Sequence, residues 1–359
     1  MDHALRRDRV LGAIRELELH ALLVTRLPNV RYLTGFSGSS GRLVLGAERA
    51  LLVVDGRYTQ QASREAADVE PVTSLEGLVG PPIEIAAALG ARVGFEREGV
   101  SFGEWERLRA AAGDDLELVP TDGVVELFRE VKDEQERALI ERAQAAADAA
   151  FDAVVLGDRL RTGVSEREIA LELELEIRRA GADGVAFEPI VAFGESAAEP
   201  HHEPSARELR LGDLVVLDFG AEVGGYRSDM TRTVAFGPPS GRAREVYGVV
   251  ADAQAAGVRA VAAGVAASNV DSAARTVVGE AGLGDAFSHP VGHAVGLEIH
   301  ESPILRSTSD APLRAGAVVT VEPGVYLPGV VGVRIEDMVE VTTEGRRVIP
   351  RTTRELIVL

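Results

Sequence analysis

The sequence of 359 residues contains no cysteine, and Lys132 is the only lysine among its 38 basic residues. Without cysteine the chain forms no disulfide and offers no thiolate to a metal, which suits a reducing compartment. The charged segment of residues 1–20 lacks the apolar core of a signal peptide, and no apolar run is long enough for a transmembrane helix. These absences predict a cytoplasmic protein. The shortage of lysine is interpreted as a bias in coding composition.

Positive charge is also scarce, because 38 basic residues face 57 acidic ones and the net charge is -19. Nucleic acids and anionic membranes attract an excess of positive charge, so neither is expected as a partner. The nucleotide-binding motifs GxGxxG and GxxxxGK[ST] and the zinc-peptidase motif HExxH are all missing. A hydrophobic content of 46% remains, enough for two domains with sizeable cores.

Residues 1–124 are predicted to form a small α/β domain, because strand-like and helix-like segments alternate. Helices are expected over residues 4–18, 57–67 and 102–112. Strands are expected over residues 21–25, 42–45, 50–54, 92–95 and 116–119. The Gly- and Ser-rich segment 29–41 is expected to be a loop.

Residues 125–359 are predicted to form a second, α+β domain that opens with a long helix over residues 132–155. Further helices are expected after Ser165, which forms a capping box with Glu168, after Ser240 and after Ser268. Two hairpins, residues 211–233 and 315–341, each follow a pair of these helices. This order predicts an internal pseudo-twofold repeat.

The two hairpins repeat each other in sequence, and acids fall on acids. An offset of 104 along the first strand matches Asp218 with Glu322, and an offset of 107 along the returning strand matches Asp229 with Glu336. A turn residue is the ordinary explanation of one such acid. Asp218 and Glu322, however, each follow an apolar run, where an unpaired carboxylate is costly. Four inward carboxylates repel one another unless cations neutralise them, so a metal site is predicted.

Three of the seven histidines, His289, His293 and His300, lie between the hairpins. A spacing of four would suit zinc on a helix. A proline and two glycines among residues 290–296 argue against a helix, so an irregular strand is expected. A single histidine is often a satisfied core residue, but three within twelve positions favour a functional role.

Four carboxylates and a histidine form an oxygen-rich ligand set, suited to pairs of Mn, Fe, Co or Zn ions. Two such ions about 3.5 to 4 Å apart could share a hydroxide and polarise a carbonyl or phosphoryl oxygen. Metal-assisted hydrolysis is the predicted reaction class, with amide, ester and phosphate bonds left open. Upstream, His201 and His202 are adjacent, so on an extended chain at most one faces the cleft. A surface loop is the alternative for both.

Together these residues resemble the metallopeptidases of the pita-bread fold, the family of methionine aminopeptidase, prolidase, aminopeptidase P and creatinase. The resemblance covers the whole second domain. It implies a dinuclear site with five ligands, Asp218, Asp229, His293, Glu322 and Glu336. Asp229 and Glu336 resemble the bridging carboxylates, and Glu322 also resembles the acid that takes a proton from the bridging water. Two divalent ions are implied, with manganese favoured and zinc or cobalt as alternatives.

The same resemblance implies a second group of site residues. His201, preferred to the histidine after it, and His300 resemble the histidines that contact the substrate and shuttle protons. His289 and Tyr326 resemble substrate-binding residues, and Arg334 stands where proline-specific members place a catalytic arginine beside the metals. Catalytic roles are therefore expected for His201, His300, Glu322 and Arg334.

The first domain, with its segment NVRYLTGFSGSSG at residues 29–41, is similar to the creatinase-type amino-terminal domain of prolidases and aminopeptidases P. Methionine aminopeptidase lacks this domain and creatinase lacks the metal ligands, so the resemblance implies a proline-specific peptidase and a homodimer. The segment is closer to the aminopeptidase P pattern, which predicts an Xaa-Pro aminopeptidase that acts on proline-containing peptides. A prolidase restricted to Xaa-Pro dipeptides is the alternative. A metal-free binding protein is more remote, because all five ligands are present.

Overall fold

The structure, a computed structural model, describes residues 1–359 and divides into unit 1, Met1–Arg129, and unit 2, Glu130–Leu359. The sequence placed the boundary after residue 124. Helix α6 (Glu126–Arg129) follows that point and is part of unit 1 in the structure. The first unit is α/β and the second is α+β, as expected. No helix combines the length and the apolar character needed to cross a membrane.

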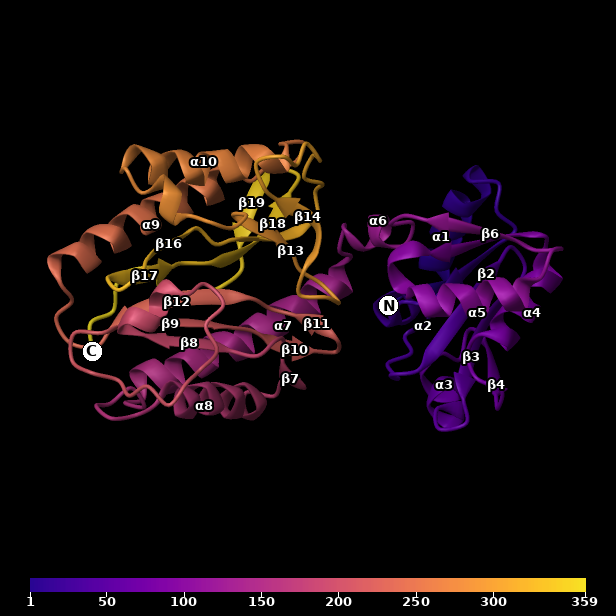
Figure 1. Ribbon diagram of the computed structural model, residues 1–359, viewed down its shortest axis with the longest axis horizontal. Coiled ribbons are helices and arrows are strands. Elements are labelled where there is room, and N and C mark those ends of the chain that lie inside the picture. Colours follow the sequence, from indigo (N-terminus) through magenta and orange to yellow (C-terminus); the bar gives the residue numbers. More distant parts are fainter. The chain divides into compact units, whose positions relative to one another are not determined.

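Unit 1 is built on a six-stranded sheet in the order β4-β3-β2-β1-β5-β6 (Figure 1). The strands are β1 (Ala21–Val24), β2 (Gly41–Gly46), β3 (Ala50–Asp55), β4 (Glu70–Ser74), β5 (Arg92–Glu96) and β6 (Glu117–Thr121). The β1-β2 and β2-β3 pairs are antiparallel, while β3-β4, β1-β5 and β5-β6 are parallel. The central strand β1 is buried along its whole length, which agrees with its unbroken apolar run.

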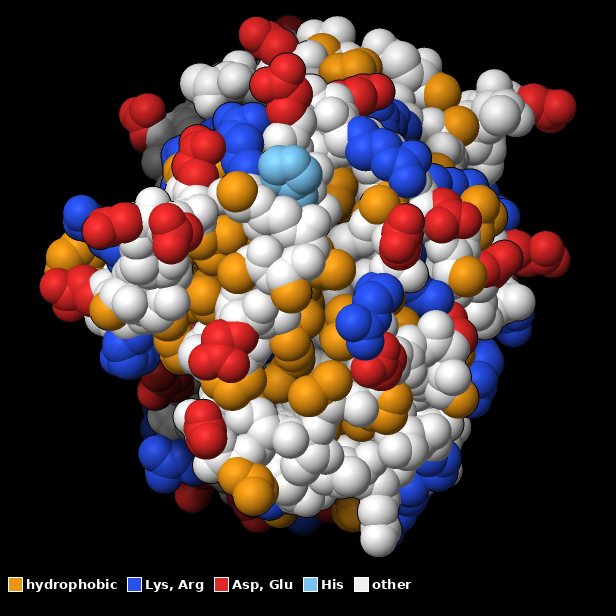
Figure 2. Space-filling view, turned by 90° about the vertical axis from the view of Figure 1, so that its right-hand side faces the viewer, with side chains coloured by type: hydrophobic (Ala, Val, Ile, Leu, Met, Phe, Trp, Pro, Cys, Tyr) orange, Lys and Arg blue, Asp and Glu red, His pale blue; other side chains and the backbone are white.

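Besides α6, the helices of unit 1 are α1 (His3–Glu16), α2 (Leu27–Thr34), α3 (Thr59–Glu65), α4 (Gly80–Leu89) and α5 (Phe102–Ala112). Helices α4 and α5 bury Ile83, Ala86 and Leu108 in one core with the sheet. On the side of unit 1 drawn in Figure 2, apolar side chains gather in a hollow between acidic and basic ones. Among the large apolar side chains of unit 1, Leu75 is 90% exposed and Phe102 is 76% exposed.

The loop expected over residues 29–41 is wrong in its first half, which lies in helix α2. A proline in the first turn suits a helix start because that position needs no amide donor. Gly35 then ends the helix with a φ of 81°, a left-handed conformation that glycine adopts readily. Tyr32 and Leu33 are buried, so tertiary packing stabilises a helix where the Gly- and Ser-rich composition had suggested a loop.

Unit 2 contains two copies of a helix pair and an antiparallel hairpin. The first half holds α7 (Glu134–Phe151), α8 (Glu166–Arg179), β7 (Gly184–Val185), β8 (Ile190–Phe193), β9 (Leu214–Phe219), β10 (Ala221–Val223), β11 (Tyr226–Arg227) and β12 (Met230–Ala235). The second half holds α9 (Gly241–Ala260), α10 (Ala267–Glu280), β13 (Gly292–Ala294), β14 (Glu301–Leu305), β15 (Val318–Val321), β16 (Gly324–Leu327), β17 (Val331–Arg334), β18 (Asp337–Thr342) and β19 (Gly345–Val348).

The sheets of unit 2 confirm the internal repeat. Strands β12, β9 and β8 form one sheet, and β14, β13, β15, β18 and β19 form another. Strands β9 and β12 pair antiparallel, and so do β15 and β18. In the sequence repeat, β15 corresponds to β9 at an offset of 104, and β18 corresponds to β12 at an offset of 107. Each half has its own apolar core, with Leu173 and Leu217 in the first and Val250 and Val319 in the second. Figure 1 shows α7 and α8 on one outer side of the strands and α9 and α10 on the other.

The helix starts of unit 2 follow the sequence with one exception. Ser165 and Glu168 form the predicted capping box of α8, and Ser240 caps α9. Ser268 does not cap α10, which begins at Ala267. The amides of residues 267 and 268 instead donate to the carbonyls of residues 311 and 309, at 2.9 and 2.8 Å. A neighbouring loop therefore satisfies the first-turn donors that a side-chain cap would otherwise serve. The long helix expected to residue 155 ends at Phe151 and continues as a π-helical turn, Asp152–Leu156.

Candidate active site

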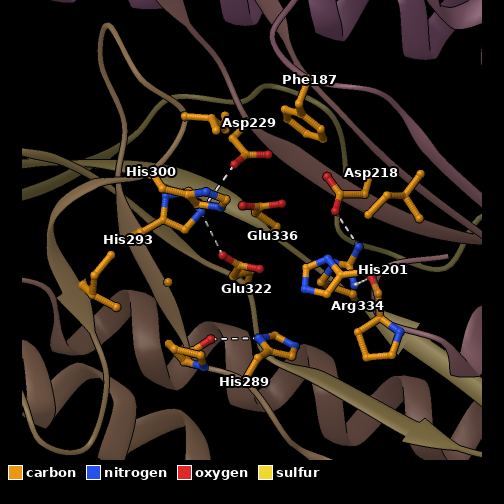
Figure 3. Close-up of a pocket in the computed structure, with 16 residues that line it drawn as sticks. Phe187, His201, Asp218, Asp229, His289, His293, His300, Glu322, Arg334 and Glu336 are labelled. Carbon is orange, nitrogen blue, oxygen red and sulfur yellow. Dashed lines mark hydrogen bonds and ion pairs between the residues drawn. The ribbon is translucent and has the colours of Figure 1, made fainter. Parts of the chain in front are cut away.

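A cavity of about 330 Å³ in unit 2 is lined by every predicted site residue except Tyr326. These residues are His201, Asp218, Asp229, His289, His293, His300, Glu322, Arg334 and Glu336 (Figure 3). Tyr326 lies beside them, because its hydroxyl contacts His289 and Arg334. The fold thus brings together side chains from both hairpins, from the segment between them and from the segment before them.

The four acids occupy matching places in the two halves of unit 2. Asp218 lies near the end of β9 and Asp229 directly before β12, while Glu322 directly follows β15 and Glu336 directly precedes β18. Each antiparallel pair therefore presents its two carboxylates at the same end. Figure 3 shows the carboxylates between the rings of His293 and His300 on one side and Arg334 on the other.

Asp229, His293 and Glu336 form the tightest group, with ligand atoms that all lie within 4.8 Å of one another. The Nε2 atom of His293 is 3.6 Å from Asp229 and 3.3 Å from Glu322. Its Nδ1 atom is 3.1 Å from the carbonyl of Ala294, which can only accept, so Nδ1 carries the proton. In the neutral ring this leaves the Nε2 lone pair facing the carboxylates, as a metal ligand requires.

Burial and mutual repulsion dominate the electrostatics of the acids. Burial, followed by the charge of Asp218, raises the pKa of Asp229 well above its usual range. Burial and then the charge of Asp229 do the same to the pKa of Glu336. Glu322 differs. Burial would raise its pKa, but the contact with His293 and the charges of His293, His289 and Arg334 together outweigh burial and lower the pKa to about 2. At His293 burial would lower the pKa, but the contact with Glu322 and the charges of Glu322 and Asp229 outweigh burial and raise it to about 9.

Two carboxylate oxygens of this cluster, Oδ1 of Asp218 and Oε1 of Glu336, are buried without a hydrogen-bond partner. A buried acceptor without a partner is costly, and a cation relieves both that cost and the repulsion between carboxylates. The donor set of oxygens and one imidazole therefore fits divalent metal ions. Asp218 and Glu322 line the same cavity but lie outside the 4.8 Å group.

A chain of hydrogen bonds joins Arg334, Tyr326 and His289 at one wall of the cavity. The Nδ1 atom of His289 is 2.8 Å from the carbonyl of Pro290 and must donate to it. Its Nε2 atom, 2.9 Å from the Tyr326 hydroxyl, then accepts from that hydroxyl. Arg334 in turn donates to the Tyr326 oxygen over 2.8 Å. Burial lowers the pKa of His289, so the ring stays neutral near pH 7 and this direction of donation is maintained.

The other histidines differ in what they contact. His201 lines the cavity, whereas the His202 ring contacts Glu166 at 2.8 Å and Glu199 at 3.0 Å. One of the two adjacent histidines therefore faces the site. His300 packs edge-on against His293 with ring centroids 4.4 Å apart, and burial lowers its pKa. The segment of these histidines is not a helix, because His293 lies in the short strand β13, whose pairing with β14 shifts register between residues 293 and 294.

Sequence reasoning missed the apolar wall of the cavity, formed by Phe187, Ile190, Pro200, Pro290, Ile299 and Ile304. These residues come from several segments, and each by itself looks like an ordinary core or turn residue. Only the assembled cavity shows that polar groups and an apolar wall face the same space. Such a combination is typical of a small-molecule or peptide site.

The comparisons with known proteins agree with this geometry. Residues 138–343 match the model of metallopeptidase family M24, and residues 6–131 match the creatinase/prolidase N-terminal domain. An Xaa-Pro dipeptidase of Pyrococcus horikoshii is 35% identical over 341 residues, which are 94% of this chain and 95% of that protein.

Two solved structures cover 99% of this chain and 100% of their own. The Xaa-Pro dipeptidase from Bacillus anthracis has a TM-score of 0.95 at 38% identity. The X-Pro aminopeptidase from Thermotoga maritima has a TM-score of 0.89 at 35% identity. The family match spans both hairpins and the histidines of the cavity, and the similarity extends over both units. The chain therefore belongs to metallopeptidase family M24, with a creatinase/prolidase-type N-terminal domain and a pita-bread catalytic domain.

Proposed function

We propose that this metallopeptidase hydrolyses the bond before proline in Xaa-Pro dipeptides. The observation that carries the proposal is the cavity itself, in which buried carboxylates and His293 lie beside neutral histidines and an apolar wall. The names of relatives that match the chain over nearly its whole length support the same substrate class. A metal-free binding protein is disfavoured, because the unsatisfied carboxylate oxygens of Asp218 and Glu336 fit a cation.

The five predicted ligands, Asp218, Asp229, His293, Glu322 and Glu336, would hold two divalent ions, with manganese as the proposed metal. Bound ions would lower the pKa of a water molecule and polarise the scissile carbonyl. The chain supplies the remaining functions. Glu322 lines the cavity, and its carboxylate is proposed to accept a proton from that water. His201 and His300 line the cavity and are proposed to contact the substrate and pass the proton to the leaving nitrogen.

The bond before proline is a tertiary amide, so the substrate offers no N–H at that position and recognition depends on shape. Phe187, Ile190 and Ile304 give the cavity an apolar wall that suits a proline ring. On the polar side, Arg334 and His289 hold the Tyr326 hydroxyl between them, which fixes the direction of its hydrogen bonds. The apolar side chains would therefore orient the proline ring, while the hydrogen-bonded chain keeps His289 and Arg334 in fixed positions at the cavity.

Two substrate lengths remain candidates. The preference for an aminopeptidase, drawn from segment 29–41, is not confirmed by the comparisons. The full-length matches to proteins called Xaa-Pro dipeptidase favour the shorter substrate. An Xaa-Pro aminopeptidase is the second candidate, because the X-Pro aminopeptidase from Thermotoga maritima also matches the whole chain at 35% identity.

The deciding experiment compares three peptides with the manganese-loaded protein: Ala-Pro, Ala-Pro-Ala and Ala-Ala. We expect hydrolysis of Ala-Pro with the highest kcat/KM and little turnover of Ala-Ala. Cleavage of Ala-Pro-Ala at its first bond, with kcat/KM equal to or above that of Ala-Pro, would favour the aminopeptidase. Absence of turnover for both proline peptides would overturn the proposal.

We also propose that the chain forms a homodimer. The hollow of apolar side chains on unit 1 (Figure 2) supports this, because large apolar surfaces commonly mark protein interfaces. Sedimentation velocity should give a mass of about twice 38.0 kDa. A single species at 38.0 kDa would contradict the proposal.

A further inference from the structure

The only lysine of the chain is buried in an ion pair. The Lys132 side chain is 1% exposed and its Nζ atom lies 3.1 Å from Oε2 of Glu301, whose side chain is 6% exposed. Every other basic residue that carries a fixed charge is arginine. The single lysine therefore stands at a closed position, where it presents a compact ammonium group to a buried carboxylate.

Lys132 is itself fixed by the backbone around it. It directly precedes the Asp133 cap of α7, so it stands at the start of a helix held by a capping box. Its amide donates to the carbonyl of Gly316 over 3.0 Å, and Arg137 donates to its carbonyl over 2.6 Å. The ammonium group thus projects from a rigid support, as a positioning group requires.

Glu301 closes a short loop that carries His300. Its Oε1 atom accepts from the amide of Glu298 over 3.1 Å, while Oε2 faces Lys132. A Cβ atom on Gly296 would lie only 2.6 to 2.7 Å from the Glu301 carboxylate oxygens, so the loop backbone packs directly on this carboxylate. His300 directly precedes Glu301, and its ring packs on the ring of His293 at 4.4 Å.

The beginning of the loop is tied to both hairpins. The amide of Arg227 donates to the carbonyl of Gly296 over 2.9 Å, and the amide of Val295 donates to Val318 over 3.0 Å. Residues 295–300 are therefore fixed at their beginning by backbone bonds. At their end, the Glu301 side chain connects the loop to Lys132.

We propose that the Lys132–Glu301 ion pair is a positioning device that locks residues 295–300 and thereby holds the His300 ring in the active site. Neither residue touches the cavity, so both act through the loop. The role of His300 in peptide hydrolysis rests on the proposed function. The locking of residues 295–300 by the ion pair does not, and it can be tested without a substrate.

The first test measures the loop directly by hydrogen exchange of residues 295–300 and by reaction of Lys132 with an amine-reactive ester, followed by peptide mapping. Because Lys132 is the only lysine, no other side-chain amine competes for the label. In the native protein we expect slow exchange of the loop and no label on Lys132. Lys132→Met should accelerate exchange in the loop. Unchanged exchange in this variant, or rapid labelling of native Lys132, would overturn the proposal.

Removing one partner of a buried pair leaves an uncompensated charge and can prevent folding. The double variant Lys132→Met with Glu301→Gln removes both charges and keeps the test valid, with the same faster exchange expected. Arg207→Met is the matched control. It breaks a partly buried ion pair with Asp213 in the same unit, and both of those residues lie in the segment before β9. It should leave exchange of residues 295–300 unchanged.

The second test is a double-mutant cycle with His300. In the wild-type background, Lys132→Met should lower kcat/KM for Ala-Pro on the order of 10²-fold, as expected for a misplaced catalytic group, with metal content retained. In a His300→Ala background the same substitution should cause no further loss. An equal loss in both backgrounds would show a general structural role and overturn the proposal. If wild-type protein cleaves no Xaa-Pro peptide, the proposed function fails, while hydrogen exchange still decides whether the pair locks the loop.

Discussion

Arg334 and Asp218 form a nearly buried ion pair, with side chains that are 4% and 12% exposed. Arg334 ends β17 in the second half of unit 2, and Asp218 lies on β9 in the first half. Burial raises the pKa of Asp218, and the charge of Arg334 opposes that rise. A cation from one half of the repeat therefore compensates an acid from the other, in the same cavity where metal ions are proposed to bind.

Arg334→Met should destabilise the metal-free protein far more than the metal-loaded protein. Without the guanidinium, Asp218 is left as a buried charge or takes up a proton, and breaking a buried pair costs about 3 to 5 kcal/mol. Divalent ions would neutralise the same carboxylate and make the loss of unfolding free energy smaller. Urea unfolding in the presence of EDTA and in excess manganese measures the unfolding free energy of the metal-free and metal-loaded protein. Arg334→Lys keeps the positive charge and should reduce the unfolding free energy less than Arg334→Met does. Equal destabilisation under the two conditions would show that the metal does not reach Asp218.

Glu336→Gln should lower the metal content of the purified protein. Wild type is expected to retain two ions per chain after dialysis, and loss of a bridging carboxylate should reduce that number to one or none. Elemental analysis by mass spectrometry gives the stoichiometry. Glu340→Gln is the matched control, because Glu340 also belongs to unit 2 but pairs with Arg347 and Arg137. Retention of both ions in Glu336→Gln would remove this residue from the ligand set.

His201→Ala and His300→Ala should reduce turnover without loss of metal. Both histidines line the cavity, and neither belongs to the group with Asp229, His293 and Glu336. General acid–base groups contribute about 10² to 10⁴-fold to rate, and kcat should fall within that range. Metal content and kcat are measured on the same preparation. A folded His201→Ala protein that has lost its metal would identify His201 as a ligand.

The contact of His202 with Glu166 predicts a stability contribution that depends on pH. Burial lowers the pKa of His202, but its bonds to Glu166 and Glu199 outweigh burial and place the pKa above the ordinary 6.5. Burial raises the pKa of Glu166, but bonds from Ser205 and His202 outweigh burial and place it below the ordinary 4.5. The His202 contribution is complete below pH 6.5 and disappears as the pH rises through its raised pKa. The Glu166 contribution is complete above pH 4.5 and disappears as the pH falls through its lowered pKa.

His202→Gln should therefore reduce the unfolding free energy most between pH 4.5 and pH 6.5, and less on either side. Urea unfolding of the metal-free protein across this range measures the difference from wild type. The control is His20→Gln in unit 1, which removes a histidine that accepts a hydrogen bond from the backbone amide of Arg92. A difference between wild type and His202→Gln that stays constant with pH would mean that the ion pair does not form in solution.

The sequence predicted most elements whose signals are local. The capping box of Ser165 and Glu168 depends only on residues close together in the chain. The two hairpins could be predicted because their sequences share the same spacing of glycines and acids. Helix α2 was missed because the Gly- and Ser-rich residues after it dominate the composition, while burial of Tyr32 and Leu33 favours the helix. The start of α10 was misplaced because a distant loop satisfies its first amides.

The sequence by itself determined the two domains, the duplicated hairpins and the acids and histidines of the site, since each is carried by spacing or by repetition along the chain. Tertiary structure alone decided which apolar residues line the cavity and that Arg334 meets Asp218. It also decided that Lys132 finds Glu301 at a separation of 169 residues. Such contacts depend on the packing of both halves at once, and no local pattern records which buried charge will meet which partner.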